Sequence, residues 1–526
     1  MSGGTAPDER LSLWHQAAVL AGVTLAVFAP TLSAGFVYDA RLQILTDPFL
    51  HDPRNWWPVL TFGTLSLDVL DFNRPVNLAS LMLDAMVWGK EPFGYHLTSV
   101  ALHAVNVVLV WAVLRGLSHG LRLGASITNS VASLLPPLLF AVHPLVTEAV
   151  CEPTFREDLL VALFTLTGLL LAMGHPAQAA ADHWRALACI ACSLLAIGSK
   201  ESGIAAPAAI GVYWLLFRRG ERGWFWPTVI CGAKIAVVAF LIARFLLEPT
   251  PSRIFEARPQ YPGGSLAAAL LIEPRILALY AQLVLLPVNL CADYGLYSVA
   301  HLPLPVALAV VAAVAAAAAV AVCRDRRMAV AVVLVIVPLL TVANLIPIYR
   351  AAADRYLYLP MAGVGLAAGL LLDAPWLANR ERLRERLLLG CAAAVVLLAA
   401  ACMERQKVWA NSLALWTDTF RKNPVAYTGA SGLAEALREA DRLPEAEATA
   451  RRAIELSDGK RGDVWATLAL ILDGQGRTAE AFAALDKAME TDPKLADPDS
   501  RVAVMAMERP YADDLKSLQA RRKALP

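Results

Sequence analysis

Acidic, basic and imidazole side chains gather in one set of alternate gaps between the apolar runs of this chain. Ionisable groups next to hydrocarbon are costly, so they are retained where they have a use. Arginine and lysine bind phosphate well, and a carboxylate beside them could take a proton from a hydroxyl. The combination predicts one polar site for an anionic substrate held in the membrane. Its members are Asp39, Arg74, His96, His143, Glu148, Arg156, Asp158, Lys200, Glu201, Asp354 and Arg355.

The sharpest motif in this set is His143-Pro144-Leu-Val-Thr-Glu148. Proline disfavours helical geometry at the preceding residue, so we expect a helix break at His143, where the chain leaves the bilayer. The spacing differs from H-E-x-x-H and from other zinc motifs. The sequence therefore names no metal ligand. It is compatible with a divalent cation and predicts no other cofactor.

Basic and acidic residues also stand together at the outer ends of three apolar runs. Arg156 and Asp158 open one run, Lys200-Glu201 closes another, and Asp354-Arg355-Tyr356 opens a third. One such pair would be explained by an ion pair at a helix terminus. Three pairs on one face are better explained by a shared site.

Two members of the set have an alternative explanation. Asp39 follows the first apolar run, where a carboxylate could be a general base, a metal ligand or a helix cap. His96 and His103 are seven residues apart, with Asn106 near the same helix face. A lone histidine in a span is more often a hydrogen-bonded packing residue than a catalyst.

The opposite gaps are rich in arginine and indicate the orientation of the chain. Short cytoplasmic loops collect Lys and Arg, so these gaps are expected on the inner face. The arginines are Arg115, Arg122, Arg218, Arg219, Arg222, Arg324, Arg326, Arg327, Arg380, Arg382, Arg384 and Arg386. The runs between the gaps lie near 14–35, 96–115, 127–146, 158–174, 186–199, 203–217, 226–247, 303–323, 328–348, 356–373 and 387–403. They predict eleven spans, with the N-terminus inside and the C-terminus outside.

A further apolar stretch at 266–290 raises the upper limit to twelve or thirteen spans. It is interrupted by Glu273, Pro274 and Arg275. If it crossed the membrane, the arginines at 324–327 would move to the outer face. The charge rule therefore favours an interfacial or re-entrant segment, or a pair of helices on the outer face.

The composition agrees with a polytopic membrane protein. Hydrophobic residues make up 57% of the 526 residues, and charged residues make up 17%, against about 25% in soluble domains. No basic patch is interleaved with aromatics, which excludes a nucleic-acid partner. The eight cysteines lie mostly inside apolar runs and are best explained as small packing residues.

Two long loops and a change of composition define the predicted domains. Residues 1–410 form a membrane domain with outer loops at about 36–95 and 248–301. Trp56 and Trp57 in the first loop favour contact with membrane lipids at headgroup level. Residues 411–526 are rich in Ala, Glu, Arg and Leu and repeat with an offset of 35, since Arg442-Leu-Pro-Glu-Ala446 matches Arg477-Thr-Ala-Glu-Ala481. This period is typical of tetratricopeptide repeats. The predicted fold is all-α, a polytopic bundle followed by a short α-solenoid on the non-cytoplasmic side.

The ordered motifs resemble those of the transmembrane and tetratricopeptide-repeat-containing O-mannosyltransferases and their bacterial relatives. The resemblance covers nearly the whole chain. The motifs are Tyr38-Asp39, Asn73-Arg74-Pro75, Gly94-Tyr-His96-Leu97, Phe140-Ala-Val-His143-Pro144-Leu-Val-Thr-Glu148-Ala-Val150, Arg156-Glu-Asp158-Leu-Leu160, Lys200-Glu201-Ser-Gly203 and Asp354-Arg355-Tyr-Leu-Tyr-Leu-Pro360.

This resemblance implies a GT-C fold glycosyltransferase that takes a sugar, with mannose a candidate, from a polyprenyl-phosphate carrier at the outer or lumenal face. It implies Asp39 as the catalytic base. Arg74, Lys200, Arg355 and Arg156 would hold the carrier phosphate. The donor pocket would include His96, His143, Glu148, Asp158, Glu201, Asp354 and Tyr356. The acceptor would be a hydroxyl on a protein, and the repeats would bind that protein or another partner.

Two other functions are compatible with the sequence. A membrane scaffold would present the repeats to partners, but it has little reason to keep charges near hydrocarbon. It would be favoured if the outer-face charges lay too far apart to share one headgroup. A transporter of a lipid-linked sugar predicts polar residues at mid-bilayer depth, where His103 and Asn106 are the candidates. The Ala-, Leu- and Arg-rich composition predicts a bacterial inner membrane, with the repeats in the periplasm.

Overall fold

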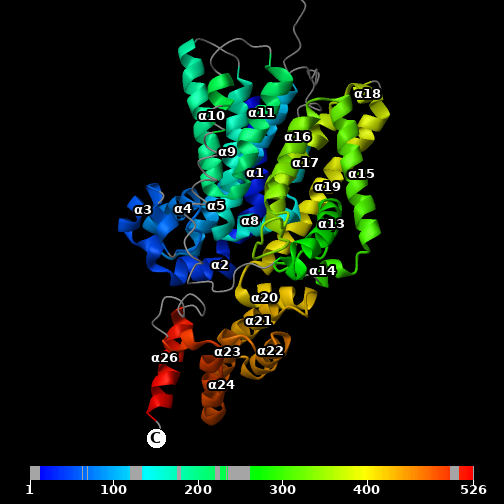
Figure 1. Cartoon of the computed structure of the whole chain (residues 1–526). Helices are drawn as coiled ribbons and strands as arrows, with labels where there is room; N and C mark the ends of the chain where they lie inside the picture. Colours follow the sequence, from blue (N-terminus) through cyan, green and yellow to red (C-terminus); the bar gives the residue numbers. More distant parts are fainter. Residues whose placement is uncertain are drawn as a thin grey trace, which may run out of the picture.

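A computed structural model of the chain describes residues 12–524 apart from 62, 68, 119–132, 175–178, 220–225, 231, 233, 235–260, 296, 379 and 498–508. Within these ranges every regular element is helical, as predicted. The long apolar helices stand side by side and form a bundle (Figure 1). A smaller group of helices lies at one end of this bundle.

Most of the predicted spans are helices. The bundle contains α1 (Leu13–Phe28), α5 (Pro92–Leu117), α7 (Leu135–Ala141), α9 (Arg156–Met173), α10 (Ala179–Ser199), α11 (Ala205–Phe217), α13 (Leu266–Leu285), α15 (Leu304–Arg324), α16 (Met328–Thr341), α17 (Tyr358–Leu372) and α19 (Glu381–Val408). Among the residues that the structure describes, six helical segments are long and apolar enough to cross a membrane, and four shorter apolar helices accompany them. The chain is thus a multi-pass membrane protein. The predicted span at 226–247 lies largely outside the described residues.

The bundle core forms because apolar side chains of α5, α7, α9 and α17 pack together, as expected for neighbouring helices. At its centre His103 contacts the rings of Phe28, Phe140 and Tyr358 at centroid distances of 5.1 to 5.6 Å. Its Nδ1 lies 2.7 Å from the Tyr358 hydroxyl and its Nε2 lies 2.9 Å from the Ala141 carbonyl oxygen. Both ring nitrogens are therefore engaged, so His103 is a packing residue.

The apolar stretch after residue 265 is one continuous helix, α13, so a pair of helices was the wrong alternative. Its length and composition would allow it to cross a membrane. Its polar contacts, however, lie with Leu302 and with the loop after α16, close to the ends of two spans that are predicted on the outer face. Asn344 donates to Glu273 at 2.9 Å, and Arg275 donates to the Leu302 carbonyl at 2.9 Å. These contacts favour an interfacial helix.

Short helices build the first outer loop beside the bundle. They are α2 (Tyr38–Ala40), the π-helical turn Arg41–Thr46, the 3-10 turns Pro48–His51, Pro53–Asn55 and Gly63–Ser66, α3 (Trp56–Leu60) and α4 (Pro75–Trp88). Figure 1 shows α3 and α4 at the side of the lower half of the bundle, with α2 below them. Proline occupies the first position of α4, where its missing N–H costs nothing. The sequence analysis did not predict α4.

The C-terminal helices repeat with the offset seen in the sequence. Here α20 (Ser412–Lys422) is followed by two hairpins, α21 (Tyr427–Glu439) with α22 (Leu443–Leu456) and α23 (Gly462–Gly474) with α24 (Thr478–Thr491). The hairpins begin at 427 and 462 and end at 456 and 491, a shift of 35 residues at both ends. A last helix, α26 (Arg509–Lys523), packs on α23 and α24. Each hairpin buries small residues such as Ala446 and Ala481 at equivalent places.

Candidate active site

Asp39 lies on a short strained turn that follows the C-terminal end of the first span. Tyr38, just before it, has φ of 51°, a left-handed conformation that aromatic residues rarely adopt. Val37 and Ala40 on either side are fully buried, whereas the side chain of Asp39 is exposed. A strained residue next to an exposed acid between buried neighbours is a pattern found at functional sites.

The surroundings of Asp39 change its acidity. Solvent reaches its side chain, yet the protein packed around the turn raises the pKa of the carboxyl above its ordinary value. The positive charges of Arg355 and Arg350 oppose this rise, and Glu157 and Glu148 add to it. Two arginines and two acids from distant parts of the chain therefore act on the same carboxyl.

Arg355 and Glu148 form a buried ion pair beside this turn. The Arg355 guanidinium contacts the Glu148 carboxylate, and the backbone N–H of Arg355 donates to Glu148 Oε2 at 3.0 Å. The guanidinium also lies over the Phe155 ring, 3.9 Å from its centroid. The helix break at His143 places Glu148 on α8 (Thr147–Cys151), which faces the turn Asp354–Leu357.

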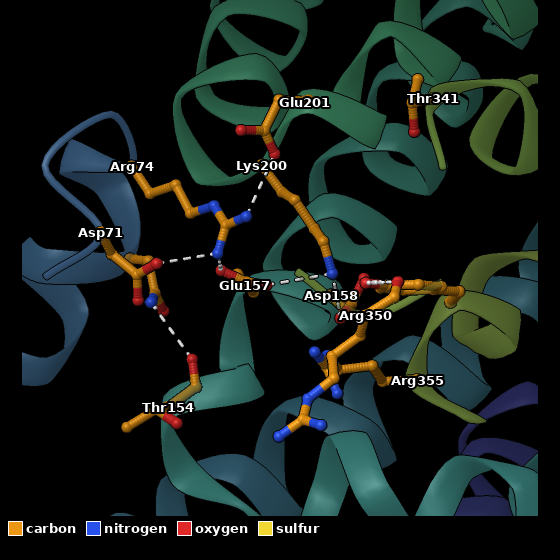
Figure 2. A network of polar contacts seen from close by, with 12 residues as sticks. Asp71, Arg74, Thr154, Glu157, Asp158, Lys200, Glu201, Thr341, Arg350 and Arg355 are labelled. Atoms are coloured by element: carbon orange, nitrogen blue, oxygen red, sulfur yellow. Dashed lines mark hydrogen bonds and ion pairs between the residues drawn. The ribbon is translucent and has the colours of Figure 1, made fainter. Parts of the chain in front are cut away.

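A second group of charges is centred on Arg74 (Figure 2). Its guanidinium contacts Asp71 at 2.8 Å, Glu157 at 2.5 Å and Glu201 at 3.3 Å. Lys200 continues the network, with its Nζ 3.0 Å from Glu157. Burial raises the pKa of Asp71 to about 6, against the effect of Arg74.

Tyr356 joins the two groups. Lys200 Nζ lies 5.3 Å from the centroid of its ring, and the Arg355 guanidinium lies 5.2 Å from it. Lys200 also donates to Asp158 at 2.6 Å. Its burial disfavours the positive charge, but Asp158 and the neighbouring acids outweigh that effect, and the pKa of the ammonium is raised. The charges around Arg74, Lys200 and Arg355 are thus brought together by direct contacts and through the Tyr356 ring, which a scattered set on a scaffold would not require.

Four sequence candidates are held by local contacts; three of them are buried and Glu201 is half-buried. The imidazole of His143 accepts from the Leu145 N–H at 3.3 Å and lies 3.2 Å from the Val284 carbonyl, so it caps the helix break. His96 is fully buried beside the Phe36 ring. Asp354 accepts from the Tyr294 hydroxyl at 2.7 Å. Glu201 accepts from Asn73 at 2.7 Å.

Arg156 is not brought into the Arg74 or Arg355 groups. It is fully buried, and its Nη2 lies 2.5 Å from Asp84 and donates to the Tyr95 carbonyl at 2.9 Å. Its Nη1 donates to Ser80 Oγ at 3.1 Å. These contacts tie α9 to α4 and α5. Sequence reasoning placed Arg156 among the phosphate ligands, but the geometry gives it a packing role.

We therefore expect Arg156→Lys to destabilise the protein. A lysine has one short head group and cannot reach Asp84, Ser80 and Tyr95 at once. Leaving buried acceptors unpaired costs about 1–3 kcal/mol. Thermal unfolding in detergent would measure the loss, while the folded fraction should keep its activity. Loss of activity with unchanged stability would instead return Arg156 to the substrate site.

Four charged residues of the site were missed by sequence reasoning. Arg350 contacts Asp293 at 2.6 Å, and its guanidinium lies 5.8 Å from the centroid of the Tyr38 ring. Glu157 bridges Arg74 and Lys200, and Asp71 pairs with Arg74. All four residues stand in the same gaps between apolar runs as the predicted set, so including every charged residue of those gaps would have found them.

Exposure separates the cations that solvent can reach from those behind them. The side chains of Arg350 and Arg74 are 25% and 23% exposed, whereas those of Arg355 and Lys200 are 10% and 5% exposed. Solvent therefore reaches Arg350 and Arg74 more readily than Arg355 and Lys200. Over the part of the chain that the structure describes, no three His, Cys, Asp or Glu side chains are placed to hold a metal ion.

The chain is similar to protein O-mannosyl-transferases, which confirms the resemblance that the motifs predicted. It is 31% identical to Tmtc1 of Drosophila melanogaster over 243 residues, 44% of this chain and 26% of that protein. It is 24% identical to F38B6.6 of Caenorhabditis elegans over 304 residues, 54% of this chain and 40% of that protein. It is 29% identical to TMTC2 of Mus musculus over 223 residues, 40% of this chain and 25% of that protein. The matches thus span a quarter to two fifths of these relatives.

No family model matches the chain. Among solved structures, ArnT from Cupriavidus metallidurans bound to undecaprenyl phosphate is similar at a TM-score of 0.42 and 15% identity, covering 97% of this chain and 89% of that one.

Proposed function

We propose that this protein is a GT-C type membrane glycosyltransferase that moves a sugar from a polyprenyl-phosphate carrier to a hydroxyl. Mannose is the first sugar to test and a protein side chain the first acceptor, because the sequence relatives are protein O-mannosyl-transferases. The site would lie on the outer face of a bacterial inner membrane, and the repeats at 411–526 would lie in the periplasm.

The observation that carries the proposal is the position of Asp39. It is an exposed acid on a strained turn, acted on by Arg350 and Arg355. A base needs access to its substrate, and a phosphate leaving group needs cations beside that base. Asp39 has that access, and Arg350 and Arg355 supply positive charge near it.

The proposed reaction is a single displacement. The acceptor hydroxyl attacks the anomeric carbon of the sugar, and a new C–O bond forms as its proton passes to Asp39. The bond between the anomeric carbon and the carrier phosphate breaks, and the phosphate oxygen keeps the electron pair. The configuration at the anomeric carbon inverts. One carboxylate suffices, unlike in glycosidases, because lipid phosphate leaves as an anion.

The cations would stabilise that leaving anion. Arg350 and Arg74 are placed to meet the phosphate first, with Arg355 and Lys200 behind them. Each already has carboxylate partners, so a bound phosphate would share these cations with Asp293, Glu148 or Glu157. Tyr356, held between Lys200 and Arg355, would form one wall of the donor pocket.

The proposal is tested by reconstituting the whole protein in nanodiscs with a short Ser/Thr peptide. Undecaprenyl-phosphate mannose and other undecaprenyl-phosphate sugars would be supplied in turn. Mass spectrometry should show one added hexose, and NMR should show an anomeric configuration opposite to that of the donor. Absence of transfer from every donor to any hydroxyl acceptor would overturn the proposal, and retention of configuration would overturn its mechanism.

The raised pKa of Asp39 predicts the pH dependence of transfer. The base must be ionised, and the protein around it raises its pKa, so activity should be lost on acidification at a higher pH than for an ordinary aspartate near pH 3.9. The rate should rise with pH through the pKa of Asp39. A pH profile of kcat/KM for the wild-type protein measures this rise in activity. If activity fell only at or below about pH 4, the assignment of Asp39 as the base would be contradicted.

A further inference from the structure

Helices α20 and α21 contact three loops that carry the candidate site. These loops are the Asp39 turn, the segment around Asp293, and the turn at Asp354. Figure 1 shows α20 and α21 directly beneath the end of the bundle where α2 lies. A module that only captured acceptor proteins would not need contacts with all three loops.

The first connection is a chain of buried charges through Arg405, in the last turn of α19. Its Nη1 donates to Asp418 of α20 at 2.8 Å, and its Nη2 lies 3.8 Å from Asp354 Oδ2. Asp354 is fully buried, and the side chains of Arg405 and Asp418 are 5% and 8% exposed. Asp354 directly precedes Arg355, so these contacts can fix the backbone that carries the Arg355 side chain.

The second connection holds the partner of Arg350. One Asp293 oxygen contacts Arg350 at 2.6 Å, and the other accepts from the Thr428 hydroxyl of α21. The Asp293 carbonyl accepts from Asn423 Nδ2 at 3.0 Å. The carboxylate that orients the exposed arginine is thus itself oriented by the repeats.

The third connection reaches the candidate base. The Trp416 ring of α20 stacks on the Tyr38 ring with centroids 5.5 Å apart and planes inclined by 24°. Two residues beyond Asp39, Arg41 Nη1 donates to Glu439 of α21 at 3.1 Å. The strained turn is therefore supported from the repeat side as well as from the bundle.

We propose that α20 and α21 position the catalytic groups, and that Asp418 is a positioning residue acting through Arg405 on Asp354 and Arg355. This inference rests on the proposed transferase function. It differs from acceptor docking in what it predicts for the kinetics. Displacing Arg355 weakens donor binding and transition-state stabilisation, whereas a lost docking site weakens acceptor binding only.

The test is Asp418→Asn in the whole protein, assayed with a short Ser/Thr peptide. Its matched control is Glu447→Gln, because Glu447 bridges Arg451 at 2.8 Å and Arg477 at 2.7 Å within the repeats. Misplacement of a positioned group by about 1 Å can cost about 100-fold, so we expect kcat/KM for the donor to fall about 10- to 100-fold in Asp418→Asn. The KM for the peptide should stay unchanged, and the control should match the wild type.

Two further variants distinguish a loss of positioning from misfolding of the protein. Asp418→Glu keeps the charge and should recover part of the activity. Thr428→Val removes only the hydroxyl that contacts Asp293 and should give a smaller donor-side loss at unchanged thermal stability. Equal donor kinetics in Asp418→Asn, Thr428→Val and the control, or a change in peptide KM alone, would overturn the positioning role. An inactive wild type would instead overturn the transferase function.

Discussion

Asp39→Asn is expected to lower kcat for sugar transfer about 10²- to 10⁴-fold, the range that a positioned general base contributes. Asparagine has nearly the shape of aspartate, so the strained turn at Tyr38 should persist. Its amide cannot take the proton of the attacking hydroxyl. Donor binding should remain, because the arginines around the turn are unchanged. Initial rates and donor binding to the same nanodisc preparation measure both quantities.

The matched control is Asp52→Asn in the same outer loop. Asp52 pairs with the exposed Arg54 at 2.7 Å, and within the described part of the chain the polar contacts of its side chain are with Arg54 and not with the site network. An exposed pair of this kind contributes little to stability, so the control should transfer sugar at the wild-type rate. Full activity of Asp39→Asn would remove Asp39 from the role of base, while loss in both variants would indicate a general effect on the loop.

Much of the fold could be predicted from the sequence because hydrophobic length and charge asymmetry are local signals. The runs that became α5, α15 and α19 are long, uniform and flanked by arginine. The repeat offset was visible because small residues recur wherever two helices touch. The break at His143 followed from one proline, and His143 has extended backbone angles there.

The organisation of the outer loops could not be predicted in the same way. Residues 36–95 have no long apolar run, and α4 has only 14 residues. Its existence depends on burying Leu78 and Leu81 against neighbouring segments, which is a tertiary effect. The partners of charged residues are hard to predict for the same reason, since Arg74 pairs with residues up to 127 positions away in the sequence.

The site was predicted as a set of residues but not as a set of roles. Ionisable residues in alternate gaps between apolar runs were predicted to share one face of the membrane. This prediction placed Asp39, Arg74, Glu148, Lys200 and Arg355 on that face. It could not separate an arginine that faces solvent from one that joins helices, because both types are expected at span ends. Arg156 illustrates this, since its partners come from two helices. The burial of the side chain distinguishes the two types of arginine, and burial cannot be deduced from the spacing of residues in the sequence.

The polar residues inside the bundle bear on the alternative of transport. Asn106 donates to the Leu159 carbonyl at 2.9 Å and to the Tyr358 hydroxyl at 3.2 Å. His103 shares that hydroxyl. Both side chains therefore make hydrogen bonds within the helix packing, which favours a structural role over a path through the membrane.

Glu148→Gln is expected to be the most destabilising of these changes. Glu148 is 1% exposed, and its carboxylate neutralises the buried guanidinium of Arg355. Glutamine preserves the shape and can still accept from the backbone N–H of Arg355, so the loss isolates the charge. A buried charge left without its partner costs about 3–5 kcal/mol. Denaturant unfolding of the purified protein, followed by tryptophan fluorescence, measures this cost.

The double variant Glu148→Gln with Arg355→Met separates the cost of the lone charge from the worth of the pair. Removing both charges leaves no unpaired guanidinium, and such replacements are often close to neutral. Stability should therefore recover in large part, while sugar transfer stays lost because a cation behind the phosphate is missing. If Glu148→Gln alone unfolds at the wild-type denaturant concentration, the pair does not hold the turn at Asp354. If the double variant transfers sugar normally, Arg355 does not act on the donor.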